Sequence, residues 1–190
     1  MAVLLGSRTT RGHILYFAIH ADAGAAEQVA AIMAAFRRRD GPTGRPVGPD
    51  GLHVSLNWVG EYEQVPDPAI ALASEAASKV IMPVFRVALN RLAAWQGPPG
   101  QRPLVLYGEE GVIGVDILYE AIGKALVSVG LQPAGAKPDI LAQMTLSRGV
   151  AEEPSEILPS PVTWQVRDFA LVHVPPGDRR RIIRTWRLHA

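Results

Sequence analysis

Two short segments of the 190-residue chain share one pattern, in which apolar side chains alternate with polar ones. The first is LHVSL at residues 52–56, and the second, about ninety residues later, is AQMTL at residues 142–146. Side chains along a β-strand alternate between its faces, so each segment, as a strand, presents two polar side chains together. Two such strands facing each other would line a polar cleft suited to a phosphate. The polar side chains are those of His53, Ser55, Gln143 and Thr145.

The rest of the chain predicts an alternation of strands and helices around these two segments. Residues 13–20 (HILYFAIH) are rich in β-branched and aromatic residues, which indicates a buried strand. Residues 24–39 carry apolar side chains at helical spacing, and residues 41–51 hold the glycines and prolines of a loop. The last strand, over residues 181–188, could also be helical. We expect strands over residues 13–20, 53–58, 84–92, 103–107, 141–147, 162–174 and 181–188, and helices over residues 24–39, 67–80 and 115–129.

The expected order of elements is β-α-β-α-β-β-α-β-β-β, and each polar strand follows a helix after a loop. This order indicates a duplicated unit. We therefore expect an α+β fold with two lobes, each a mostly antiparallel sheet with helices packed outside, and a central cleft between the two polar strands. Residues 1–12 are expected to form a loose leader, and residues 13–190 a single bilobal domain.

The composition excludes several classes of protein. The chain is 48% hydrophobic and 19% charged, which provides for a sizeable core, and its net charge of +1 gives no bulk field for nucleic acid. Without cysteine there are no disulfides or thiolate zinc sites, which fits a reducing cytoplasm. The apolar run at residues 14–19 after Arg8 and Arg11 is shorter than the roughly 7–15 residues of a signal peptide. No run approaches the ~20 apolar residues of a membrane span. We expect a cytoplasmic monomer.

The polar strands and their flanks resemble the two-histidine phosphoesterase superfamily, in particular its RNA 2′,3′-cyclic phosphodiesterases, historically named 2′-5′ RNA ligases. That family carries two copies of His-x-Thr/Ser-apolar. The first copy here is HVSL, followed by NWVGE at residues 57–61, which resembles the family's run ending in Leu-Gly-Glu. LYFAI at residues 15–19 looks like the family's opening strand, and QMTLSR at residues 143–148 is similar to its His-x-Thr-Leu-Ala-Arg. The resemblance spans about residues 13–188.

The sequence departs from the family at Gln143, where the family has its second catalytic histidine. The preceding residues 137–141 (KPDIL) also differ from the usual Phe-x-Pro-His approach. A natural replacement and an introduced inactivating one both fit this position. The departure leaves the predicted fold unchanged, but it predicts a weaker activity, because one positioned acid or base contributes about 10²–10⁴-fold.

The resemblance implies a hydrolase that opens the 2′,3′-cyclic phosphate of an RNA end or small nucleotide to a 2′-phosphate, as in RNA processing. It implies that His53 is one acid–base residue, as acid or as base, since an imidazole titrates near neutral pH. Ser55 and Thr145 would donate hydrogen bonds to the phosphate, and Arg148 would add positive charge. Gln143 could bind a water molecule or phosphate oxygen but could not transfer a proton. We expect no metal ion and no other cofactor, since no cluster has metal-ligand spacing.

Two alternatives to this enzyme stay open. One is a catalytically dead module that binds nucleotide or RNA-end phosphates, and the other is an α+β protein without a phosphate role. His20 could reach the cleft, although a surface position is the default. The basic run of Arg179 to Arg181 with Arg184 and Arg187 has a solvated face as its default and an RNA backbone contact as the alternative. The aromatic residues expected mainly in the core, with one or two able to stack on a base, are Trp58, Trp95, Trp164 and Tyr107.

Overall fold

The computed structural model describes residues 12–40, 44–95, 101–133, 142–150, 155–177 and 180–189. The expected leader, apart from Gly12, lies outside these residues. The elements are β1 (His13–His20), α1 (Ala23–Asp40), β2 (Arg45–Pro46), the 3₁₀ helix η1 (Pro49–Gly51), β3 (His53–Tyr62), α2 (Asp67–Ser78), β4 (Phe85–Ala94), β5 (Arg102–Tyr107), α3 (Ile113–Ser128), β6 (Gln143–Val150), β7 (Ser155–Val166), β8 (Asp168–Val174) and β9 (Arg181–Arg187).

The strands form one nine-stranded sheet in the order β7-β4-β5-β6-β3-β1-β8-β9, with the short β2 beside β6. Neighbouring strands are antiparallel. The sheet has two halves, β7-β4-β5-β6 and β3-β1-β8-β9, which meet where Val54 of β3 pairs with Met144 of β6. The predicted α+β fold with mostly antiparallel strands and outer helices is confirmed. The expected sheets of the two lobes are joined to each other through this pair.

The apolar run of β1 is explained by burial on both of its faces. Leu15, Phe17 and Ile19 pack into the main core, whereas the alternate residues belong to a second apolar cluster on the other face. Apolar side chains on both faces of a strand are expected only where both faces are covered. The members of the second cluster are Ile14, Tyr16, Ala18, Ala170 and Val172, with Trp58 and Val174 packed against them.

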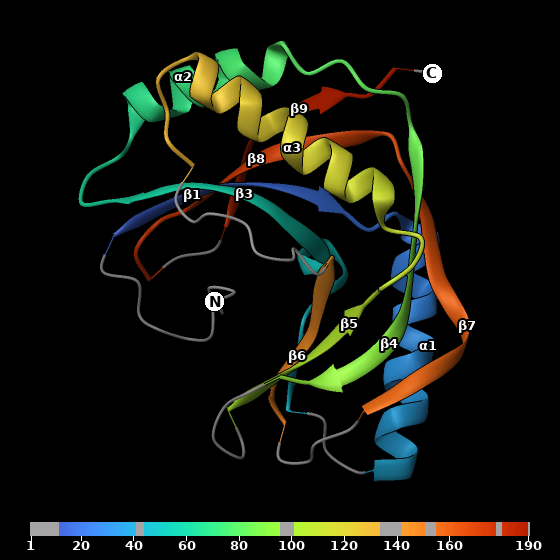
Figure 1. The fold of residues 1–190 in the computed structure, drawn as a ribbon. Coiled ribbons are helices and arrows are strands. Elements are labelled where there is room, and N and C mark those ends of the chain that lie inside the picture. Colours follow the sequence, from blue (N-terminus) through green and yellow to red (C-terminus); the bar gives the residue numbers. More distant parts are fainter. Residues whose placement is uncertain are drawn as a thin grey trace.

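Two of the helices pack against the half of the sheet to which they are not connected in sequence. Helix α1 joins β1 to β3 but lies against β7 of the other half, as Figure 1 shows. Helix α3 joins β5 to β6 but packs on β3 and α2, with a further contact to β4. Helix α2 contacts β9. Each half of the sheet is therefore covered partly by a helix from the other.

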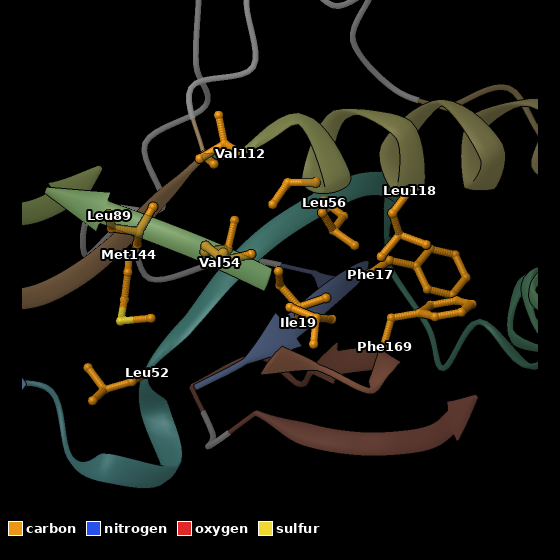
Figure 2. Close-up of a cluster of buried hydrophobic side chains, with 14 of the residues drawn as sticks. Phe17, Ile19, Leu52, Val54, Leu56, Leu89, Val112, Leu118, Met144 and Phe169 are labelled. Atoms are coloured by element: carbon orange, nitrogen blue, oxygen red, sulfur yellow. The ribbon is translucent and has the colours of Figure 1, made fainter. Parts of the chain in front are cut away.

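The main core lies between the sheet and these helices, and it includes the apolar side chains of both motif strands. Figure 2 shows Val54 and Met144 in this core together with Phe17, Ile19 and Leu118. Val54 and Met144 are fully buried. Because side chains alternate along a strand, the residues flanking Val54 and Met144 must point to the opposite face.

The prediction of one strand over residues 162–174 is wrong, because the chain changes halves within it. Strand β7 ends at Val166 and pairs with β4, whereas β8 begins at Asp168 and pairs with β1. Arg167 lies between the two strands, and its carbonyl oxygen accepts a hydrogen bond from the amide of Leu188 at 2.8 Å. The alternation of apolar with polar residues up to Val166 is interrupted at Arg167 and Asp168, which is a sign of the break that the prediction overlooked. The helical alternative for the C-terminal segment is also wrong, because β9 pairs with β8.

Candidate functional site

The pairing of β3 with β6 brings the polar residues of the two motifs together. Val54 and Met144 are directly opposite in this antiparallel pair, so the register places His53 beside Thr145, and Ser55 beside Gln143. All four side chains are on the face opposite the main core. Ser55 is exposed, and the other three are partly buried. The sheet thus forms the shared polar face that the two sequence motifs predict.

His53 is held by groups from three other parts of the fold. Its Nδ1 lies 2.8 Å from the carbonyl oxygen of Gly51, the last residue of η1, and its Nε2 lies 3.3 Å from the hydroxyl of Tyr16 on β1. Arg180, which immediately precedes β9, places Nη1 2.6 Å from His53 Nδ1 and 3.3 Å from Nε2. The same Nη1 donates to the Gly51 carbonyl at 3.1 Å. The imidazole is therefore fixed in position.

The surroundings of His53 strongly favour its neutral form. Burial, followed by the positive charge of Arg180, lowers the pKa of His53 from its ordinary 6.5 to about 3. His20 and Arg148 act in the same direction, and the hydrogen bond to Gly51 opposes them. In the site without a ligand the ring is therefore uncharged at neutral pH and can accept a proton.

Several arginine side chains act on the site. Burial, and then the neighbouring Arg180, lowers the pKa of Arg148, with a smaller effect of Arg45. Arg45 is the partner of Arg148 in the pairing of β2 with β6. Burial raises the pKa of Tyr16, although Arg180 and Arg148 oppose this rise. Guanidinium groups gathered in this way attract an anion, and their planar fork matches the oxygens of a phosphate.

Gln143 contributes an unsatisfied polar atom to the site. Its Oε1 is buried and accepts no hydrogen bond from the part of the chain that the structure describes. A buried acceptor of this kind is normally satisfied by a protein group or a water molecule. The carboxamide oxygen is therefore available to a donor on a ligand or on a water molecule, although a carboxamide cannot exchange a proton at neutral pH.

The sequence interpretation missed two of the groups that contact His53. Arg180 belongs to the basic run whose default was a solvated face, and only the pairing of β9 with β8 brings it to the site. Tyr16 was expected simply as part of a buried strand. His20 pairs with His53 across β1 and β3, their ring centroids are 5.8 Å apart, and burial lowers the pKa of His20. It therefore lies beside the site, in place of the surface position taken as its default.

Among the described residues, no group of three or more histidine, aspartate or glutamate side chains could hold a metal ion. The helices of the described part are also too short or too polar to cross a membrane.

The fold is that of known phosphoesterase structures. A crystal structure of a phosphoesterase has a TM-score of 0.71 with this chain at 24% sequence identity, over 94% of this chain and 99% of that one. The apo form of E. coli LigT has a TM-score of 0.69 at 24% identity over the same shares. TT0787 of Thermus thermophilus has a TM-score of 0.65 at 20% identity, over 92% of this chain and 97% of its own. Comparison with family models and curated proteins gives no match. The fold that the resemblance implied is thus confirmed.

Proposed function

We propose that this protein is an RNA 2′,3′-cyclic phosphodiesterase-like hydrolase, impaired by Gln143, that opens a terminal cyclic phosphate to a 2′-phosphate. The observation that carries the proposal is the pair Val54–Met144, which puts one complete His-x-Ser motif beside one Gln-x-Thr motif on a single polar face. The substrate would be an RNA end or a small nucleotide.

The structural neighbours support a phosphate ester as the ligand. E. coli LigT has been crystallised with 3′-AMP, with ATP and with phosphate. These are ligands of that protein. In this chain, the arginines around the site and the hydroxyl groups of Ser55 and Thr145 supply the positive charge and hydrogen-bond donors that such a ligand requires.

The proposed reaction is the attack of water on phosphorus, with cleavage of the bond from phosphorus to the ribose 3′ oxygen. His53 is neutral and fixed, so it would accept the proton of the attacking water as general base. Ser55, Thr145 and Arg148 would bind the phosphate oxygens, on which negative charge increases in the transition state. The leaving 3′ oxygen must also take up a proton, and no imidazole on β6 supplies it.

Gln143 stands where a second proton carrier would be needed, and this explains the expected impairment. Its carboxamide can orient a water molecule or a phosphate oxygen, but it has no accessible pKa for proton transfer. We therefore expect residual hydrolysis with a single titrating imidazole. A histidine in place of Gln143 should raise the rate by about 10²-fold or more.

The experiment compares hydrolysis of 2′,3′-cyclic AMP by the wild type and by the variants Gln143→His, Gln143→Asn and His53→Asn. We expect a large gain with Gln143→His and a bell-shaped pH profile, since two imidazoles then titrate. Gln143→Asn is the matched control and should give no gain. The double variant with His53→Asn and Gln143→His should lack this gain in activity. A wild type with a turnover in the ordinary range of about 1–10³ s⁻¹ would contradict the assigned role of Gln143.

A second candidate function is a module that binds nucleotide or RNA-end phosphates without hydrolysing them. The unsatisfied Gln143 Oε1 favours it, since this atom can bind a ligand donor but cannot protonate a leaving group. This module is supported if the wild type binds adenosine 2′-phosphate while neither the wild type nor Gln143→His hydrolyses 2′,3′-cyclic AMP.

A further inference from the structure

Arg180 has an unusual set of partners for a guanidinium group. Its Nη1 donates to the Gly51 carbonyl and lies against the ring nitrogens of His53. Burial raises the pKa of Tyr16, and Arg180 opposes this rise both by its charge and by a hydrogen bond. Within the described ranges, no carboxylate pairs with Arg180. An arginine at a partly buried site without an anionic partner has donors available for an oxyanion.

The contact with His53 has a consequence for the protonation of the imidazole. The neutral ring has one nitrogen with a proton, which can donate to the Gly51 carbonyl or to the Tyr16 hydroxyl, and one nitrogen without, which can accept from Arg180. An imidazolium carries protons on both nitrogens, and one would point at a guanidinium 2.6 Å away. Arg180 in this position and a protonated His53 therefore exclude each other.

A bound phosphate would change both partners. Its oxygens are stronger acceptors for Arg180 than a neutral imidazole, because both groups are then charged. Once Arg180 has moved to the phosphate, a proton on His53 Nδ1 can be donated to the Gly51 carbonyl, which already lies 2.8 Å away. The charged groups whose effects reach His53 are Arg180 and Arg148, with His20 beside it, and none of them is negative.

We propose that Arg180 is a specificity residue that leaves His53 to bind the phosphate of the ligand. The site then selects a dianionic phosphate monoester over a monoanionic cyclic diester. His53 takes up a proton when the monoester binds. This inference rests on the proposed function. A phosphate monoester carries about −1.5 to −2 charges at pH 7. It therefore gains more than a diester from Arg180, Arg148 and a newly protonated His53. In terms of the proposed reaction, the product with its 2′-phosphate stays bound.

The test is isothermal titration calorimetry at pH 7.5 with adenosine 2′-phosphate and with 2′,3′-cyclic AMP. Each titration is repeated in two buffers of different ionisation enthalpy, which gives the number of protons taken up on binding. For the wild type we expect the monoester to bind at least about tenfold more tightly than the cyclic diester, the effect of one hydrogen bond between charged groups. Proton uptake should accompany the monoester.

The variants separate the role of Arg180 from a general effect of charge. Arg180→Gln should lose most of the monoester preference and the proton uptake, and His53→Asn should lose the uptake alone. Arg38→Gln, which removes an exposed arginine of α1, should behave as the wild type. Arg180→Lys keeps the positive charge and replaces Arg180→Gln in these titrations if that variant does not fold. It should show a preference for the monoester between those of the wild type and Arg180→Gln.

The outcomes distinguish this inference from the proposed function. Equal binding of both ligands by the wild type, without proton uptake, would overturn the role of Arg180 and leave the phosphate site in place. Unchanged preference in Arg180→Gln would overturn it as well. Failure of the wild type to bind either ligand would overturn the proposed function and this inference together.

Discussion

Acidification from pH 7 to pH 5 should destabilise this protein, and a substitution of His53 should remove much of that effect. The pKa of His53 is lowered from 6.5 to about 3 in the folded protein. Between these values the unfolded chain binds a proton at His53 that the folded protein does not bind. Stability must therefore decrease as the pH falls below 6.5, and the loss stops growing near pH 3.

The size of this effect follows from the difference between the two pKa values. At pH 7 the imidazole is mostly neutral in both states, whereas at pH 5 it is protonated in the unfolded state alone. At 1.36 kcal/mol for each pH unit, the free energy of unfolding should fall by at most about 2 kcal/mol between pH 7 and pH 5. For a chain of this size, that corresponds to a decrease of roughly 4–8 °C in the unfolding temperature.

The assay is thermal unfolding at pH 7, 6 and 5 for the wild type, His53→Gln and His189→Gln. His53→Gln removes the titrating ring, so its loss of stability should be smaller by about the amount above. His173, whose pKa burial also lowers, is present in all three proteins and cancels in the comparison. His189 is exposed, and its variant should behave as the wild type. Identical pH dependence in the wild type and His53→Gln would refute the reasoning.

Three further perturbations test the core and the site. Asn57 is buried with both side-chain polar atoms unpartnered among the described residues, so Asn57→Leu should raise the free energy of unfolding by about 1–3 kcal/mol; a lower unfolding temperature would contradict this. A Cβ at Gly114 would collide with the Phe85 ring, so Gly114→Ala should lower stability by about 1–3 kcal/mol in urea unfolding, and an unchanged midpoint would argue against that contact. Thr145→Ala and Arg148→Ala should weaken binding of adenosine 2′-phosphate, and added salt should weaken it in the wild type; unchanged affinity in both variants would mean that the phosphate site is assigned wrongly.

The sequence predicted the elements well where their pattern is local. The strand at residues 13–20 has the predicted bounds, and the helix expected over residues 24–39 extends by one residue at each end. The apolar, polar alternation of the two motifs also predicted which side chains share a face. The charged pair Arg167 and Asp168 marks the crossover in the sequence, but nothing local shows that the residues on its two sides pair with different halves of the sheet.

The candidate site was predicted in part for a similar reason. His53, Ser55, Gln143 and Thr145 follow from a local pattern and one pairing of strands. The contact between Arg180 and His53 joins residues 127 positions apart, and it depends on where the loop before β9 turns. The run of arginines was the available signal, but such a run is ordinarily a solvated surface. Its charge could be read from the sequence, whereas its position could not.

The exchange of helices between the two halves of the sheet has a consequence for folding. Helix α1 is bound to β7 by two hydrogen bonds between the Gln28 side chain and the Thr163 backbone. The Thr163 amide donates to Gln28 Oε1 at 3.3 Å, and Gln28 Nε2 donates to the Thr163 carbonyl at 3.4 Å. Arg39 of the helix also forms an ion pair with Glu156 of β7. The half β3-β1-β8-β9 is completed only by β8 and β9, which follow all strands of the other half in the sequence. A fragment ending before β4 would leave the apolar face of α1 without β7. We therefore expect the two halves to fold in one cooperative and comparatively slow step, as contacts distant in sequence require.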